Sequence, residues 1–148
     1  MSSRRVFLKS VATCAAATAC VACGATTGGA SSPGGGGADI PAGPLSKLAV
    51  GSLTAVDNVD VCIARDAQGV YAMSLVCTHA GCDMSVDGTV SASGIFCSCH
   101  GSRFDPNGKV LRGPARSTLP HFKVSADAAG ILTIHSGTEV DPATRLAV

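Results

Sequence analysis

Two short stretches decide how this chain is interpreted: Cys77-Thr78-His79-Ala80-Gly81-Cys82 and, further on, Cys97-Ser98-Cys99-His100-Gly101-Ser102. Each stretch pairs a cysteine with a histidine, as C-x-H in the first and C-x-x-H in the second. Thiolates and imidazoles at such spacing are metal ligands. Two loops that each supply one Cys and one His therefore predict a single metal centre between them.

Two kinds of centre accept two cysteines and two histidines: a structural zinc ion and a [2Fe–2S] cluster. Paired cysteines or paired histidines would favour zinc, whereas each pair here is mixed. Zinc also gives no role to the additional Cys82 and Cys99. An asymmetric cluster, with thiolates on one iron and imidazoles on the other, fits the mixed pairs, and we favour it over zinc.

The forms C-T-H-x-G-C and C-x-C-H-G-S resemble the Rieske iron–sulfur proteins, specifically the disulfide-containing quinol–cytochrome c oxidoreductase branch. The resemblance implies one [2Fe–2S] cluster per chain, with Cys77 and Cys97 on the inner iron and His79 and His100 on the outer one. Imidazole ligands raise the reduction potential above that of all-cysteine ferredoxins. The free ring nitrogens at the tip would couple electron uptake to proton uptake.

The same resemblance implies roles for residues that are not ligands. Cys82 and Cys99 match a disulfide pair that joins the two loops, and Gly113-Pro114-Ala115 matches a third loop that shields the cluster. Ser102 matches a serine whose hydroxyl donates to a bridging sulfide. Phe104 stands where higher-potential relatives carry a tyrosine hydroxyl, and the missing hydrogen bond predicts a lower potential.

The folded part of the chain predicts an all-β domain. At 148 residues the chain has room for one domain, and residues 45–136 contain no convincing helical periodicity. The resemblance independently implies an antiparallel β-sandwich with a small cluster-binding subdomain over that range. Strands are expected at Asn58–Arg65, Val70–Val76, Ile95–Cys97, Arg103–Phe104, Lys109–Leu111, Phe122–Ser125 and Ile131–His135.

The amino-terminal segment, residues 1–23, predicts export. Ser3-Arg4-Arg5-Val6-Phe7-Leu8-Lys9 matches the twin-arginine motif, and the short apolar run Val11–Ala22 follows it as in a signal peptide. The twin-arginine route carries folded proteins, which suits a cofactor inserted before export. Cys23 is a candidate lipidation site; simple cleavage before it and an uncleaved anchor are the alternatives.

The remaining segments predict little structure. Residues 24–44 are rich in Gly, Ser and Pro and predict a flexible linker, and residues 137–148 predict a C-terminal tail. The formal net charge of +1 gives no indication of nucleic-acid binding.

These features predict an electron-transfer protein on the periplasmic side of the membrane, anchored or lipidated. The resemblance implies a subunit of a respiratory oxidoreductase that passes one electron from a quinol-type donor to a cytochrome c-type acceptor and is not catalytic alone. Phe104 is similar to what arsenite oxidase small subunits often show, so the small subunit of a periplasmic molybdenum oxidase is an alternative, as is a free-standing carrier. A ring-hydroxylating oxygenase is excluded, because its mononuclear iron needs further ligands on another domain.

Overall fold

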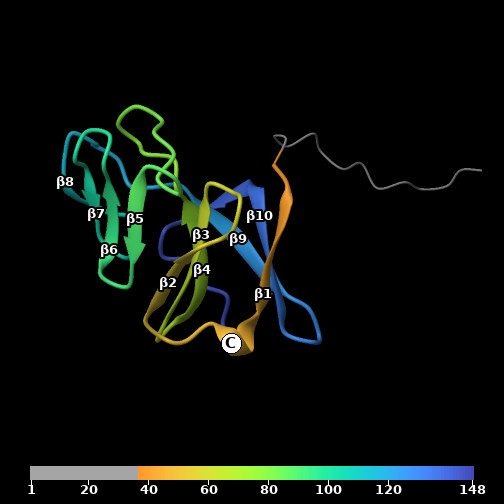
Figure 1. Cartoon of the computed structure of the whole chain (residues 1–148). Coiled ribbons are helices and arrows are strands. Elements are labelled where there is room, and N and C mark those ends of the chain that lie inside the picture. Colours follow the sequence, from red (N-terminus) through yellow and green to blue (C-terminus); the bar gives the residue numbers. More distant parts are fainter. Residues whose placement is uncertain (1–36) are drawn as a thin grey trace, which may run out of the picture. The chain divides into compact units, whose positions relative to one another are not determined.

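The computed structural model describes residues 37–148, which form antiparallel sheets joined by turns (Figure 1). The predictions for the twin-arginine segment, for Cys23 and for the first part of the linker lie outside the described residues. Within residues 37–148, no helix is long and apolar enough to span a membrane. A short 3₁₀ turn, η1, covers Leu45–Lys47.

The strands of the described residues make two sheets. The larger sheet has the order β1-β10-β9-β4-β3-β2, and the smaller has the order β5-β6-β7-β8. The bounds in the larger sheet are β1 Asp39–Pro44, β2 Ser52–Ala55, β3 Val61–Asp66, β4 Gly69–Ser74, β9 His121–Ala126 and β10 Ile131–Val140. Those in the smaller sheet are β5 Gly88–Ser91, β6 Gly94–Cys97, β7 Arg103–Phe104 and β8 Val110–Arg112. The prediction of an all-β antiparallel fold with a small cluster-binding subdomain is confirmed, and the small sheet belongs to that subdomain.

Strands β3 and β4 are buried on both faces, because they separate two hydrophobic cores. Side chains alternate along a strand, so Val61 and Ile63 pack into one core and Cys62 and Ala64 into the other. The first core lies against β9 and β10. The second is shared with the small sheet and contains the cysteines at the start of both metal-ligand motifs, so β4 and β6 lead directly into the site.

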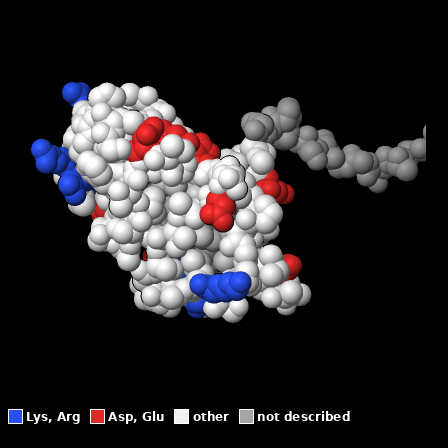
Figure 2. Space-filling view, in the orientation of Figure 1, with Lys and Arg blue, Asp and Glu red and all other residues white. Residues whose placement is uncertain are grey.

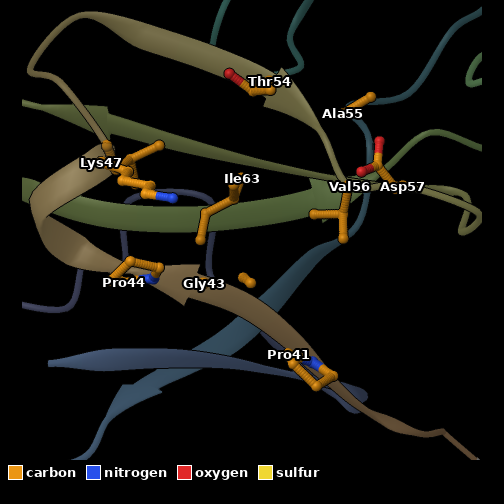
Figure 3. A pocket seen from close by; sticks show the side chains of 11 residues that line it. Pro41, Gly43, Pro44, Lys47, Thr54, Ala55, Val56, Asp57 and Ile63 are labelled. Atoms are coloured by element: carbon orange, nitrogen blue, oxygen red, sulfur yellow. The ribbon is translucent and has the colours of Figure 1, made fainter. Parts of the chain in front are cut away.

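The edge strands of the larger sheet, β1 and β2, border a hollow of about 450 Å³ (Figure 3). Pro41 and Pro44 line it from β1, Thr54 lines it from β2, and Ile63 belongs to β3 beside it. Its lining contains neither Cys nor His, so this hollow is separate from the metal-ligand residues.

The predicted linker, residues 24–44, ends earlier than expected, because β1 occupies Asp39–Pro44 and pairs with β10. Proline and glycine give this segment low strand propensity. Its order comes from pairing with β10, which is distant in sequence, and includes a 2.6 Å contact between His135 Nδ1 and Asp39 Oδ1. Such tertiary pairing leaves no local signal in the sequence.

The predicted C-terminal tail, residues 137–148, is also part of the folded domain. Strand β10 continues to Val140, and Leu146 exchanges backbone hydrogen bonds of 2.9 and 2.8 Å with Val70. Between them, Arg145 donates to Asp66 Oδ2 at 2.7 Å. The contacts that anchor this segment are again with residues distant in sequence, so the sequence alone did not indicate them.

Arg145 also connects the two sheets. Its guanidinium lies 3.7 Å from the centre of the Tyr71 ring, and its Nη2 donates to Asn107 Oδ1 at 2.7 Å, in the turn between β7 and β8. The Tyr71 hydroxyl donates to the Pro106 carbonyl of the same turn at 3.0 Å. The C-terminal segment therefore holds the small sheet against the large one.

Candidate metal centre

The first cysteine–histidine loop follows β4 and closes on itself by backbone hydrogen bonds. The Cys77 N–H donates to the Cys82 carbonyl at 2.8 Å, and the Gly81 N–H donates back to the Cys77 carbonyl at 2.9 Å. Gly81 has φ +74°, a left-handed conformation that a glycine adopts without steric cost. The loop is thereby folded tightly around its first cysteine.

The second loop, after β6, repeats this arrangement. The Cys97 N–H donates to the Ser102 carbonyl at 2.9 Å, the Gly101 N–H donates to the Cys97 carbonyl at 3.0 Å, and Gly101 has φ +84°. The two loops thus present their cysteine and histidine from matching backbone frames, despite the different spacings C-x-H and C-x-x-H.

The four predicted ligands separate by burial. Cys77 and Cys97 are 2 % and 1 % exposed, whereas His79 and His100 are exposed. The two imidazole rings lie edge to face with centroids 4.7 Å apart. The loops therefore place two thiols inside the protein and two imidazoles together at its surface, as an asymmetric two-iron cluster requires.

The two buried thiols also lie close to one another. Burial raises the pKa of Cys97, and a hydrogen bond with the Cys77 thiol raises it further. A thiol must lose its proton to become a ligand, so loading a cluster at this site would release protons.

A disulfide joins Cys82 to Cys99, with the two Cα atoms 6.6 Å apart, and so ties the two loops together. The sulfur atoms of Cys82, Cys97 and Cys99 lie within 4.8 Å of one another. Because two of these sulfurs are bonded to each other, only Cys97 of this group remains free to bind metal.

The third loop, which contains Gly113 and Pro114, lies against the first. The Thr78 hydroxyl donates to the Ser117 carbonyl at 2.7 Å, and Thr78, His79, Pro114 and Arg116 line one small hollow. Thr78 had no predicted role beyond its place in the first motif. Its position between a cysteine and a histidine was visible, but its partner lies 39 residues away.

Ser102 and Phe104 are both fully buried beside the ligand loops. The Ser102 hydroxyl oxygen accepts a hydrogen bond of 3.0 Å from the Ala115 N–H, so the third loop fixes its position and leaves its proton free to donate. Phe104 packs in the same core as Cys77 and Cys97.

The residues present therefore fit a cluster of this type. Two buried thiols, two exposed imidazoles and one buried hydroxyl surround one end of the shared core. Sulfides of a cluster accept hydrogen bonds, so the buried Ser102 hydroxyl also fits a cluster.

Residues 40–123 match the family model described as the Rieske [2Fe-2S] domain, and these are more than half of the chain. The chain belongs to the Rieske family. Its domain binds a [2Fe–2S] cluster, and the resemblance inferred from the two loops is confirmed. The assignment of individual ligands to each iron stays a prediction.

The Rieske chain is similar to iron–sulfur subunits of the cytochrome b6-f complex. The subunit of Synechococcus elongatus is 38 % identical over 86 residues, which are 57 % of this chain and 47 % of the relative. That of Synechococcus sp. (strain WH7803) is 44 % identical over 62 residues, which are 42 % and 34 % of the two chains. This Rieske chain therefore matches less than half the length of these curated relatives.

Among solved structures, the Rieske domain is similar to the cyanobacterial plasma membrane Rieske protein PetC3 from Synechocystis PCC 6803. The TM-score is 0.49 at 27 % sequence identity, over 64 % of this chain and 97 % of that chain.

Proposed function

We propose that this protein is an exported one-electron carrier, which receives electrons from a quinol-type donor and passes them to a cytochrome c-type acceptor. It would act as a subunit of a respiratory oxidoreductase and would not be catalytic alone. The observation that carries this proposal is the surface pair His79 and His100 in front of two buried thiols. The similarity to subunits of the cytochrome b6-f complex supports membership of a redox complex.

The cluster supplies reversible one-electron chemistry when it is bound. The chain supplies the rest. The two imidazoles lie at the surface, where a quinol hydroxyl can approach and a ring nitrogen can accept its proton. The buried thiols, the disulfide and the third loop keep water away from the inner half of the site.

One observation favours a second candidate, the small subunit of a periplasmic molybdenum oxidase of the arsenite oxidase kind. Phe104 is buried at the position where higher-potential relatives carry a tyrosine hydroxyl. A lower reduction potential would suit a different donor. A free-standing periplasmic carrier remains the third alternative.

We test the cluster by paramagnetic resonance of the reduced full chain. The wild-type protein should contain two irons and give a rhombic Rieske spectrum, and His79→Ala or His100→Ala should abolish it. His135→Ala is the matched control, because that histidine contacts Asp39 and Ser125 and no ligand loop. Stoichiometric zinc without iron in gently purified protein would overturn the assignment.

The donor is tested with a membrane fraction that contains the protein and a reduced quinol analogue. Quinol-dependent reduction of cytochrome c should fall at least tenfold in His100→Ala and remain unchanged in His135→Ala. Cluster reduction by an oxoanion substrate of a molybdenum enzyme, without any response to quinol, would select the second candidate.

Export and anchoring rest on residues 1–23. Replacing Arg4 and Arg5 by Lys should retain the precursor in the cytoplasm. Mass spectrometry of the mature protein would distinguish lipidation at Cys23 from simple cleavage near Ala22 and from an uncleaved anchor. Unchanged export of the double Lys variant would refute the twin-arginine assignment.

A further inference from the structure

The small sheet has an outer face that the site described above does not use. Strand register places Thr89, Phe96, Arg103 and Arg112 directly opposite one another across β5, β6, β7 and β8. Because side chains on opposing positions share a face, these four form one row. The neighbouring row, which includes Phe104, packs into the core, so the row with the two arginines faces outward.

Two apolar side chains interrupt this polar face. Phe96 is half-buried, with the Arg103 guanidinium 4.8 Å from its ring centre. The pairing of β7 with β8 shifts register between Arg103 and Phe104, which leaves Leu111 as an extra residue between Val110 and Arg112. Leu111 is 66 % exposed, and it shares a shallow hollow of about 340 Å³ with Phe96 and Arg103. Bulges of this kind re-aim a side chain.

The small sheet is cationic in an otherwise acidic domain. Its strands and the turns between them, residues 88–112, carry three cations, Arg103, Lys109 and Arg112, and one acid, Asp105. The rest of the described chain carries nine acids and five cations. In Figure 2 basic side chains lie at the edge where Figure 1 places β7 and β8, and acidic ones gather away from it.

The pairing of Arg103 with Arg112 works against folding, because like charges at directly opposed positions destabilise a sheet. Arginine and aromatic side chains around an exposed apolar residue are instead typical of the centre of protein–protein interfaces. The separation of charge would steer a partner of opposite sign toward this face.

The outer face of the small sheet is also close to Cys97, one of the predicted cluster ligands. Phe96 is bonded directly to Cys97, whose thiol lies on the buried side of the same strand. A partner seated on the outer row is therefore separated from a ligand by the thickness of one strand.

We propose that the outer face of β5–β8 is a docking site for an acidic electron-transfer protein, distinct from the surface of His79 and His100. The proposal rests on the function proposed above. The exchange moves one electron, from the reduced cluster to an oxidised one-electron centre of the partner, and it forms and breaks no bond. A protein fits better than an anionic membrane, because Leu111 is the one exposed large apolar side chain on β5–β8.

The test uses holoprotein and a gold electrode covered with a mixed monolayer of carboxylate and methyl ends, which mimics an acidic partner with an apolar centre. Adsorbed mass and electron exchange are measured on the same surface at low and high salt. Arg103→Gln/Arg112→Gln should weaken adsorption at least tenfold at low salt. Lys47→Gln/Lys123→Gln removes the same charge from η1 and β9, away from the small sheet, and should change adsorption less than twofold.

Two further variants separate the contribution of the Arg112 charge from that of the apolar Leu111 side chain. Arg112→Gln alone leaves the Arg103–Phe96 contact intact and should still weaken adsorption, and Leu111→Ser should weaken it only when methyl ends are present. Equal behaviour of the two double variants would overturn the proposal. So would an arginine-dependent preference for phosphatidylglycerol vesicles, which would reassign the face to a membrane.

The two proposals fail differently. If the docking proposal alone is wrong, the Rieske spectrum and the redox wave persist in every variant while adsorption is insensitive to the arginines. If the cluster assignment is wrong, both the spectrum and the wave are absent even in the wild-type protein.

Discussion

At the scale of single residues, Ser102 is positioned to influence the reduction potential. Its oxygen accepts from the Ala115 N–H at 3.0 Å, so its proton is free to bond to the cluster. A net hydrogen bond of roughly 0.5–1.5 kcal/mol corresponds to roughly 20–65 mV for one electron. Ser102→Ala should lower the potential by at least that amount in film voltammetry. An unchanged potential would mean that the proton bonds elsewhere.

A substitution at Phe104 should change the reduction potential in the opposite direction. Phe104→Tyr adds a hydroxyl in the core that contains Cys77 and Cys97. A hydrogen bond to a cysteine sulfur favours the more negative reduced state, so the potential should rise by roughly 20–65 mV. Voltammetry of the intact variant decides the matter. No shift would mean that Phe104 only fills the core and that the family's tyrosine position does not correspond to it.

His121 should make the free energy of unfolding depend on pH. It is buried, its Nδ1 lies 2.9 Å from the Leu119 carbonyl, and its Nε2 has no partner among the described residues. Burial lowers its pKa, and the charge of Arg145 lowers it further, against the Leu119 hydrogen bond and the acids Asp141 and Asp105. Because the folded state resists protonation, the stability that neutral His121 contributes is present above the ordinary value of 6.5 and is lost as pH falls below it.

Urea unfolding at pH 7.5 and pH 5.5 checks this dependence. The wild-type protein should lose more stability between the two values than His121→Asn, whose amide can still donate to Leu119. Equal pH slopes would contradict it. His79 and His100 remain in both proteins, so their contribution cancels in the comparison.

At the scale of elements, the C-terminal segment should contribute measurably to stability through Arg145. The side chain is 13 % exposed and combines an ion pair with Asp66, a cation–π contact with Tyr71 and a hydrogen bond to Asn107. Arg145→Met should lower the free energy of unfolding by about 2 kcal/mol. Lys123→Met, on an exposed position of β9, is the control and should change it by less than about 0.5 kcal/mol.

The ion pair between Arg145 and Asp66 should contribute less to stability at low pH, because it needs an ionised Asp66 carboxylate. Burial by itself would raise the pKa of Asp66, but hydrogen bonds from Arg145, Gln68 and Gly69 and the Arg145 charge lower it below 3.8. The stabilisation is therefore present above pH 3.8 and is lost as the pH falls through the lower folded value. The difference between wild type and Arg145→Met should shrink in acid.

Local pattern predicted some elements and missed others for a physical reason. Alternating Val and Ile predicted β3, the Asp66–Gly69 turn placed β4 after it, and the Asp105–Gly108 turn predicted β7 and β8. Strand β1 contains two prolines and a glycine, and only pairing with β10 orders it. The Cys–His loops could be predicted because each cysteine and histidine lie close together in the sequence. The Thr78–Ser117 contact could not, because it depends on how distant segments meet.

At the scale of the whole molecule, the domain needs both of its ends. A fragment of residues 45–136 lacks β1, the end of β10 and Arg145, so it loses an edge strand and the contacts that Arg145 makes between the sheets. We expect no cooperative thermal transition by circular dichroism for this fragment, whereas residues 37–148 should melt cooperatively. Equal melting temperatures would show that the added segments are dispensable.

The prolines of β1 affect how molecules of this protein can associate with one another. An exposed strand edge is a template on which a second chain can extend the sheet, and proline interrupts it by removing an N–H. Pro41 and Pro44 lie in the edge strand beside the hollow of Figure 3. The prolines therefore disfavour sheet-to-sheet joining of neighbouring molecules along this edge, and crowded copies are less prone to grow into fibres through β1.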